Sequence, residues 1–253
     1  MYHLNHFRDK IAGGGTCVGP SVTFTDPLVS EALAPEADFL WIDTEHTPMT
    51  VESVSAHLLA ARACQTPAFV RVPASDTGGI KRMLDAGVGG IIVPQIASVQ
   101  EVERIVADSR YPPAGNRGFG PRRPMDYGRR TLPDYLQEAD DQVFVSVQIE
   151  RIEALEQVED IARIPGLDSL VLGPMDLSAS LGRLGEVDHP KVEAAMDRVI
   201  TAARDAGVLV GMGMGAQPQL AAQWAERGVD WIQLGCDFEY LVGDARSLFE
   251  AFR

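Results

Sequence analysis

Eight short apolar runs recur along the chain, and the stretches between them have the residue spacing of amphipathic helices. The runs are rich in β-branched and aromatic residues and cover residues 16–22, 39–43, 68–72, 90–94, 143–149, 169–172, 208–212 and 231–234. Strands that alternate with helices form parallel sheets, because each helix returns the chain to the edge where the next strand starts. Eight such units in 253 residues suit a closed barrel better than an open sheet. No linker or composition break divides the chain, so we expect residues 1–253 to form one (β/α)8 TIM-barrel domain of the α/β class.

The chain is strongly acidic, with a net charge of −14. Such a surface repels phosphate backbones and anionic lipids, so neither nucleic acid nor membrane is an expected partner. Its three cysteines, Cys17, Cys64 and Cys236, are odd in number and widely spaced, which does not fit a disulfide framework. The first residues lack the cationic and apolar pattern of a signal peptide. We therefore expect a cytoplasmic protein.

Ionisable and amide side chains gather at the ends of the predicted strands. Catalytic groups of a barrel lie at the C-terminal ends of its strands, so these side chains should meet at one mouth. The second run ends in IDTEH (residues 42–46), the third in Arg71, the fifth in QIE (148–150), and the sixth continues into GPMD (173–176). Of the five histidines, only His46 stands at a strand end, which favours an acid/base role over a structural one.

Glu150 and Asp176 are about one βα unit apart and should lie on adjacent strands. Two carboxylates without His or Cys partners suit a hard cation such as Mg²⁺ or Mn²⁺. The alternative is that each caps a helix, because both precede segments that could start one. We favour the metal site.

Arg71 follows an apolar strand and needs a compensating anion if it is buried. An ion pair with a neighbouring carboxylate and a clamp on a substrate oxygen are equally compatible with this position. The three lysines, Lys10, Lys81 and Lys191, all lie in predicted helices or at their starts. A Schiff-base enzyme needs an amine at the mouth, so covalent imine chemistry is disfavoured and a metal Lewis acid is favoured.

About 30 residues of irregular sequence lie between the helix that follows the fourth strand and the start of the fifth strand. Residues 115–130 of this inserted loop contain five arginines, which could attract an anionic substrate as a lid or pair with acidic groups at an interface. We slightly favour the interface or a solvated loop.

Several of these runs resemble those of the HpcH/HpaI aldolases, a family of class II, metal-dependent pyruvate aldolases. They are DFLWIDTEH (38–46), VR (70–71), RYPPAGNRG (110–118), QIE (148–150) and GPMDLS (173–178), in the family's order and over nearly the whole chain. The resemblance implies that Glu150 and Asp176 ligate a divalent cation, with Mg²⁺, Mn²⁺ and Co²⁺ as the candidates. It also implies that Gln148 and the backbone around Met175 and Asp176 hold pyruvate.

The resemblance assigns the remaining catalytic roles to Arg71, His46 and Asp85. Arg71 would stabilise the enolate, and His46 would act as acid/base toward the aldehyde-derived hydroxyl, helped by Asp85. The sequence LDAG (84–87) looks like a helix end on the opposite face of the barrel, so this help could be indirect or come from another subunit. A tryptophan of some members is absent from residues 16–20, and residues 121–130 also differ. We expect both segments to border the aldehyde pocket.

The implied reaction is reversible cleavage of a 4-hydroxy-2-oxo acid to pyruvate or hydroxypyruvate and an aldehyde, through a metal-stabilised enolate. Alternatives are a related metal-dependent lyase, acting on an acyl-CoA or decarboxylating oxaloacetate, and a non-catalytic metabolite-binding barrel. Family members commonly form hexamers, arranged as trimers of dimers, that exchange C-terminal helices, and residues 248–252 could belong to such a helix.

Overall fold

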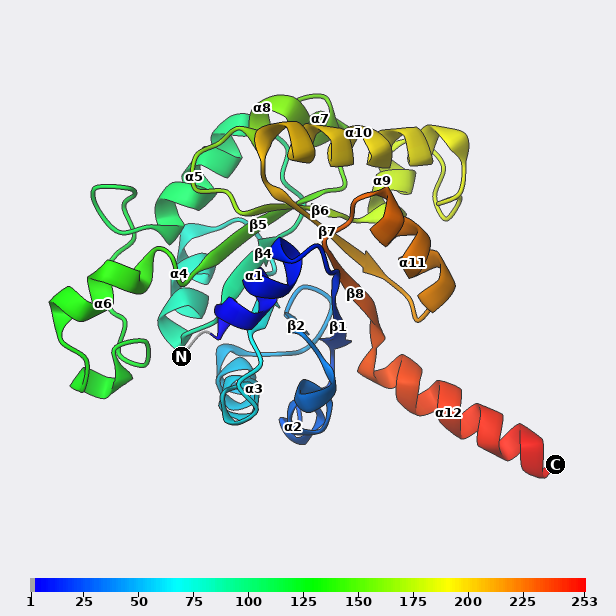
Figure 1. Ribbon diagram of the computed structural model, residues 1–253, viewed down its shortest axis with the longest axis horizontal. Helices are drawn as coiled ribbons and strands as arrows, with labels where there is room; N and C mark the ends of the chain where they lie inside the picture. The colour runs from blue at the N-terminus through cyan, green and yellow to red at the C-terminus, as the bar shows by residue number, and fades with distance from the viewer. Residues whose placement is uncertain (1–2) are drawn as a thin grey trace.

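The computed structural model describes residues 3–253, in which eight parallel strands close into a barrel in sequence order (Figure 1). The expected (β/α)8 architecture is confirmed. All eight predicted runs are strands, and their ends agree with the prediction to within two residues. They are β1 (Cys17–Val22), β2 (Leu40–Asp43), β3 (Ala68–Arg71), β4 (Gly90–Val93), β5 (Phe144–Ile149), β6 (Ser169–Leu172), β7 (Leu209–Met214) and β8 (Trp231–Cys236).

Helices surround the barrel, and several begin and end at residues suited to those positions. The side chains of Thr50, Asp76, Ser98 and Thr131 each accept a hydrogen bond from a backbone N–H of the first turn. The helices are α1 (Leu4–Ala12), α2 (Leu28–Leu33), α3 (Val51–Ala63), α4 (Thr77–Ala86), α5 (Val99–Ser109), α6 (Leu132–Ala139), α7 (Ile152–Leu155), α8 (Val158–Ala162), α9 (Pro174–Ser180), α10 (Pro190–Ala206), α11 (Pro218–Arg227) and α12 (Asp237–Phe252). No described helix is long and apolar enough to span a membrane.

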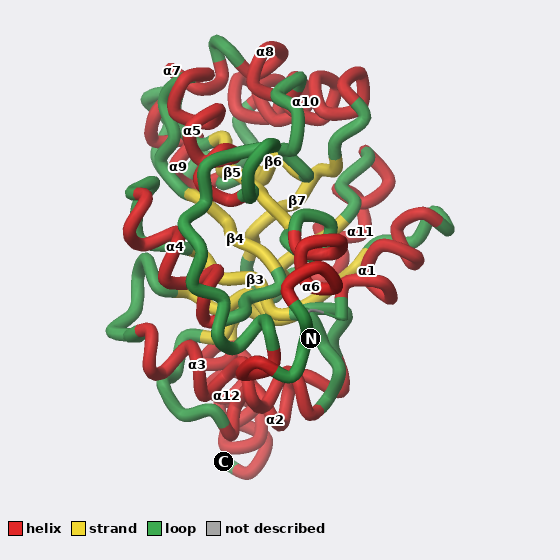
Figure 2. Tube along the Cα trace, turned by 90° about the vertical axis from the view of Figure 1, so that its left-hand side faces the viewer, coloured by secondary structure: helices red, strands yellow, loops and turns green. Residues whose placement is uncertain are grey.

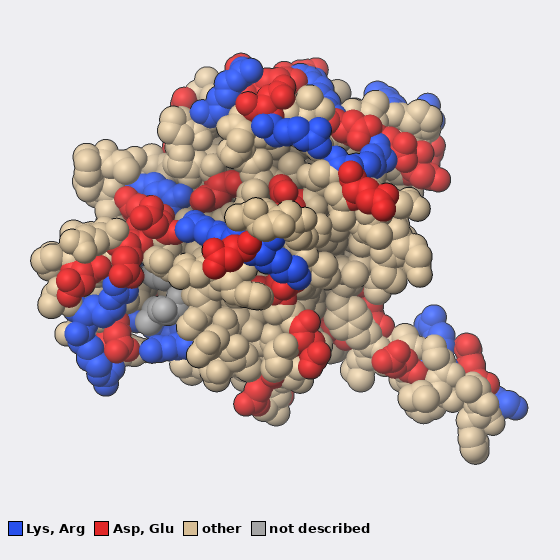
Figure 3. Space-filling model, viewed as in Figure 1, with Lys and Arg blue, Asp and Glu red and all other residues tan. Residues whose placement is uncertain are grey.

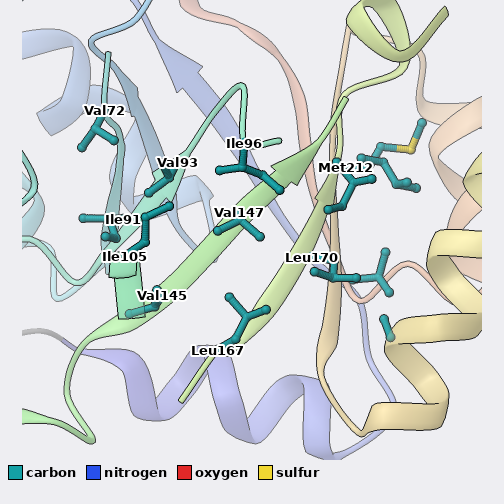
Figure 4. Close-up of a cluster of buried hydrophobic side chains, with 14 of the residues drawn as sticks. Val72, Ile91, Val93, Ile96, Ile105, Val145, Val147, Leu167, Leu170 and Met212 are labelled. Carbon is teal, nitrogen blue, oxygen red and sulfur yellow. The ribbon is translucent and has the colours of Figure 1, made fainter. Parts of the chain in front are cut away.

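The core has two layers, separated by the sheet. The outer layer lies between strands and helices and consists mainly of aliphatic side chains, such as Val93, Ile105, Val145 and Leu170 (Figure 4). The inner layer fills the barrel with larger rings, among them Phe39, Phe69, Phe144 and Trp231. Because both faces of every strand are covered, the strands read as continuous apolar runs.

The N-terminal end of the barrel is closed by α1. The ring of Phe7 packs edge-on against the rings inside, with centroids 5.1 Å from Phe69 and 5.8 Å from Phe39. This helix crosses the end of the barrel that faces the viewer in Figure 1. A ligand that enters the barrel must therefore do so from the opposite, C-terminal end.

The alternation of side chains along each strand places polar groups at that open end. Successive residues of a strand point to opposite faces, so residues two apart share the barrel interior. In β2 the interior positions are Trp41 and Asp43, with Phe39 just before the strand, and in β3 they are Phe69 and Arg71. The same spacing that buries aromatic rings near α1 thus brings charged groups to the mouth.

The arginine-rich insertion lies on the flank of the barrel, outside α4, where α6 faces the viewer in Figure 2. Its arginines contact this chain itself. Arg117 is fully buried, lies 3.2 Å from Asp85 and stacks over the ring of Tyr111. Arg123 donates to the carbonyl of Ala86, and Arg130 pairs with Glu138. A segment fixed in this way is not a free lid over the mouth.

The last helix, α12, projects away from the body of the protein (Figure 1). In Figure 3 its surface is mostly uncharged, with charged residues in small groups. Its exposed apolar side chains are those of Leu241, Val242, Leu248, Phe249 and Phe252. The swapped arrangement implied by the family resemblance stays a prediction.

Candidate active site

Asp43 and Arg71 form a two-pronged ion pair at the mouth. The strands β2 and β3 pair with these two residues directly opposite each other. Arg71 donates from Nε to Asp43 Oδ1 at 3.0 Å and from Nη2 to Oδ2 at 2.8 Å. Both side chains are largely buried, at 16% and 5% exposure, so water screens the pair poorly. Of the two interpretations of Arg71, the ion pair is therefore present, and it also holds the guanidinium in a fixed orientation.

Glu45 joins this pair to His46. Its Oε2 atom lies 3.2 Å from Arg71 Nη1 and 3.6 Å from His46 Nε2. The backbone N–H groups of Glu45 and His46 point at Asp43 Oδ1, at 3.0 and 3.5 Å, which fixes the turn after β2. Burial raises the pKa of Glu45, against the opposing effect of Arg71. The imidazole itself is mostly exposed and faces the cavity at the mouth.

Glu150 is the most deeply buried carboxylate of the mouth, with 2% of its surface exposed. It lies two residues after the inward-facing Gln148 and therefore points the same way. Oε1 accepts a hydrogen bond from the Gln95 N–H at 2.6 Å, and Oε2 accepts one from Gln148 Nε2 at 2.9 Å. Burial, together with the negative charges of Asp176 and Glu45, raises the pKa of Glu150 to about 7. Because burial disfavours the charged form of this carboxylate, a nearby cation would stabilise that form strongly.

Asp176 lies in the first turn of α9, directly after β6, and its side chain is exposed to the mouth. The first residues of α7 and α9 receive no side-chain cap from either carboxylate, because their N-cap residues are Arg151 and Gly173. The helix-capping alternative for Glu150 and Asp176 is therefore wrong.

Gly173 makes room for the Glu150 carboxylate. A Cβ atom at this position would lie 2.7 Å from Glu150 Oε2 and 3.2 Å from Gln148 Nε2, so a side chain here would displace the end of the Glu150 side chain. The backbone φ of Gly173 is −110°, so the glycine is required by space and not by conformation. Glycine here lets the strand ends of β5 and β6 approach at the level of the carboxylates.

The oxygen atoms at this point fit a hard divalent cation. Glu150 and Asp176 supply carboxylates, and the buried Oε1 of Gln148 has no hydrogen-bond partner among the described residues. Within residues 3–253, no three His, Cys, Asp or Glu side chains form a complete metal cage. A cation held here would thus complete its shell with water or substrate oxygens.

Asp85 is not brought to His46 within the described chain. It ends α4, and its carboxylate contacts the buried Arg117 of the insertion. The prediction that it lies on the opposite side of the barrel matches this position. Met175 is 55% exposed on α9 and borders an apolar cavity with Met212, Met214 and Trp224.

The two segments expected to border the aldehyde pocket do not line the cavity beside Arg71 and His46 within this chain, and their contact with the aldehyde stays a prediction. The cavity beside Arg71 and His46 is lined from the end of β1, by Ser21 and Thr23, and not by residues 16–20. Residues 16–20 include the beginning of β1, and Pro20 borders a separate groove near α12. Residues 121–130 lie on the flank.

Four contributors to the site were missed from the sequence: Asp43, Glu45, the backbone N–H of Gln95, and Gly173. Glu45 stands between Asp43 and His46 in the same strand-end run, so its position gave a usable signal. Gln95 adopts a left-handed conformation, with φ of 57°, that turns its N–H toward Glu150. The residue type alone does not predict this backbone conformation.

The family model described as HpcH/HpaI aldolase/citrate lyase matches residues 23–243, a span that includes His46, Arg71, Glu150 and Asp176. The chain belongs to the HpcH/HpaI aldolase/citrate lyase family. Membership makes it a carbon–carbon lyase, and the family resemblance of its sequence motifs is confirmed.

Relatives of this HpcH/HpaI protein match along almost its full length. A 4-hydroxy-2-oxo-heptane-1,7-dioate aldolase of Shigella flexneri is 35% identical over 98% of this chain and 93% of its own. A hydroxypyruvate/pyruvate aldolase of Deinococcus radiodurans is 36% identical over 98% of this chain and 90% of its own. A crystal structure of a family protein from Burkholderia cenocepacia J2315 superposes with a TM-score of 0.92 at 36% identity, over 98% of this chain and 99% of that chain.

Proposed function

We propose that the protein is a divalent-metal-dependent pyruvate aldolase that reversibly cleaves a 4-hydroxy-2-oxo acid into pyruvate, or hydroxypyruvate, and an aldehyde. The observation that carries the proposal is the buried Glu150 beside Asp176, at the same mouth as the fixed guanidinium of Arg71. Aldolases of 4-hydroxy-2-oxo acids and of hydroxypyruvate or pyruvate are among its relatives at 33–36% identity, which supports this reaction class.

Glu150 and Asp176 would hold the cation, and Mg²⁺ or Mn²⁺ suits their hard oxygen ligands. When bound, such a cation supplies Lewis-acid polarisation of a keto oxygen. Gln148, fixed by its hydrogen bond to Glu150, presents a second polar group to the pyruvate end of the substrate. The backbone near Met175 and Asp176 would border the same end.

Arg71 would offset the negative charge that develops when the carbon–carbon bond breaks. Its hydrogen bonds to Asp43 use two of the five N–H groups of a guanidinium, which leaves others for Glu45 and a substrate oxygen. Because Asp43 fixes its orientation beforehand, Arg71 needs no rearrangement in the transition state.

His46 would take the proton of the C4 hydroxyl at Nε2 in the cleavage direction. The C3–C4 bond then breaks, its electron pair passes to the pyruvate fragment as an enolate, and the aldehyde departs. Return of that proton from the His46 imidazolium to C3 of the enolate gives pyruvate. Glu45, near His46 Nε2, stabilises the imidazolium that forms. If Asp85 assists His46, it does so from another copy of the chain, since its own copy engages Arg117.

The test is pyruvate release from a 4-hydroxy-2-oxo acid, before and after treatment with EDTA. We expect activity to stop and to return with Mg²⁺ or Mn²⁺, and Glu150→Gln and Asp176→Asn to remove it. Glu153→Gln is the matched control, because Glu153 is an exposed carboxylate of α7 paired with Arg151. Turnover that is insensitive to EDTA would contradict the proposal, and no turnover with any hydroxy-oxo acid would favour a metabolite-binding barrel.

An acyl-CoA substrate is not supported by the insertion. A CoA site needs several cations free to bind phosphates, whereas Arg117, Arg123 and Arg130 already contact groups of this chain, which leaves the exposed Arg122 and Arg129. The aldolase is therefore preferred over the acyl-CoA lyase.

We also propose that the protein is a homo-oligomer, with a trimer of dimers as the expected form. The apolar side chains of Leu241, Leu248 and Phe249 on the projecting α12 support this, because a protein rarely leaves such a helix uncovered. Mass measurement in solution, with a truncation before Leu241, tests the role of α12. A monomeric full-length chain would contradict it.

A further inference from the structure

The loop that follows β1 is held by the first residue of α12, which lies 214 residues further along the chain. Asp237 accepts hydrogen bonds from the backbone N–H groups of Thr23 and Phe24, at 2.8 and 2.9 Å, and from the Thr23 hydroxyl. It also accepts the N–H of Phe238, in the first turn of its own helix, at 2.9 Å. Only 5% of Asp237 is exposed, so water competes poorly for these bonds and the carboxylate is firmly oriented.

These hydrogen bonds take over where β1 leaves the sheet. Pairing of β1 with β8 ends at Ser21, after an irregularity in register, and its pairing with β2 ends at Val22. The N–H groups of Thr23 and Phe24 lie beyond both ladders, and Asp237 accepts both of them. Backbone N–H groups need such partners, so this one side chain fixes the path of the chain after the strand.

The loop held in this way forms part of the wall of a cavity of about 590 Å³ at the mouth. Residues 23–25 line the cavity together with His46 and Arg71. Under the proposed function, His46 serves the hydroxyl derived from the aldehyde, so the aldehyde binds beside this loop. The bonds to Asp237 are made within one chain, and they hold the loop whichever groups a second copy adds to the mouth.

We propose that Asp237 is a positioning residue of the aldehyde site. It is not among the residues that line the cavity, so it acts through residues 23–25 and not on the substrate. Glu150 and Asp176 follow β5 and β6, whereas the Asp237 bonds join the ends of β1 and β8. Loss of these bonds should therefore impair the aldehyde step and spare enolate formation. The inference rests on the proposed function and adds a residue that governs its second substrate.

The test is Asp237→Asn, which keeps the size of the side chain and turns one acceptor oxygen into an N–H donor. Condensation of pyruvate with butanal at saturating Mn²⁺ gives the KM for each substrate. Exchange of pyruvate C3 protons for deuterium, followed by NMR without aldehyde, reports enolate formation alone. We expect the KM for butanal to rise by about tenfold, because the loop is no longer held in place. The KM for pyruvate and the exchange rate should stay within about threefold of the wild type.

Asp230→Asn is the matched control. Asp230 directly precedes β8, at the end of the barrel that α1 closes, and its Oδ2 atom accepts the N–H of Val210 at 2.7 Å. The variant thus loses a comparable bond between a carboxylate and the backbone, but away from the mouth. Its KM for butanal and its exchange rate should match those of the wild type. A rise in the KM for butanal equal to that in Asp237→Asn would show general loosening of the barrel and overturn the inference.

A second pair of variants covers the case in which Asp237→Asn does not fold. Thr23→Val removes the hydroxyl that donates to Asp237 and keeps the size of the side chain. It should raise the KM for butanal by about threefold. Thr23→Ser keeps a hydroxyl for Asp237 and should raise that KM less than Thr23→Val does. Equal KM values for the two variants would overturn the inference.

The two measurements separate the inference from the proposed function. A wild-type KM for butanal in Asp237→Asn, or an exchange rate that falls as much as condensation does, overturns the positioning role and leaves the aldolase proposal standing. Exchange without condensation of butanal in the wild type would show that the aldehyde does not bind beside the loop, with the same consequence. Absence of exchange in the wild type overturns the proposed function and the inference with it.

Discussion

Substituting Gly173 by alanine should damage the cation site without disturbing the fold around it. The added Cβ would lie 2.7 Å from Glu150 Oε2, about 0.7 Å short of ordinary contact at 3.4 Å. Alanine tolerates the backbone φ of −110° at this position, so the strain falls on the neighbouring side chains. Glu150 cannot retreat easily, because both of its oxygens are held by Gln95 and Gln148.

A shift of this size is enough to matter for a metal ligand. Changes in the shell that orients a ligand typically cost about 10–100-fold in metal affinity. We therefore expect Gly173→Ala to weaken Mn²⁺ binding by about that factor, measured by calorimetry or by the EPR signal of free Mn²⁺. The concentration of Mn²⁺ that half-restores activity after EDTA should rise in parallel.

Gly243→Ala is the matched control. Gly243 lies in α12, and a Cβ there meets no atom within 4 Å. It should bind Mn²⁺ like the wild type. Wild-type Mn²⁺ affinity in Gly173→Ala would refute the argument that Glu150 and this glycine form the cation site.

The remaining predictions concern the other charged groups of the mouth and the flank. Arg71→Ala should lower kcat/KM for cleavage by about 10²–10³-fold while Mn²⁺ affinity changes little, since Arg71 is expected to act on developing charge; equal losses in both would assign it to metal binding. Since burial raises the pKa of Glu150 to about 7 from 4.5, the metal-free folded state binds the extra proton between these values. Its stability should therefore fall by up to roughly 3 kcal/mol as pH rises from about 4.5 through 7, with the loss absent in Glu150→Gln; a flat difference between the two proteins in urea unfolding would contradict this. For the same reason, Mn²⁺ affinity should weaken as pH falls below about 7, because the proton competes with the cation. Asp85→Ala should destabilise the fold by about 3 kcal/mol, because it leaves the buried Arg117 guanidinium without its carboxylate partner. Adding Arg117→Leu to the same chain should partly reverse this loss of stability. An unfolding midpoint of Asp85→Ala like that of the wild type would show that Asp85 has no such structural role.

The sequence was sufficient for the fold because the barrel depends on a repeated pattern. Eight apolar runs separated by helical segments identify eight strands whatever their exact ends. The site was predictable where its residues lie on strands, because side chains alternate between the two faces of a strand. Asp43, Arg71 and Glu150 are each placed by inward-facing alternation on a strand, so counting residues along the strand locates them.

The parts that escaped prediction depend on loop conformation and on contacts between distant segments. The left-handed backbone of Gln95 aims an N–H at Glu150, which lies 55 residues away. The burial of Arg117 against Asp85 depends on how the insertion packs on α4. The insertion has no repeating hydrophobic pattern from which that packing could be predicted.

The mouth divides into two halves of different electrostatic character. On one side, Glu150 and Asp176 concentrate negative charge that a divalent cation can neutralise. On the other, Arg71 is already neutralised by Asp43 and Glu45, so that half presents no excess positive charge. An oxo acid needs a cation for its own carboxylate and keto group and would find it in the first half.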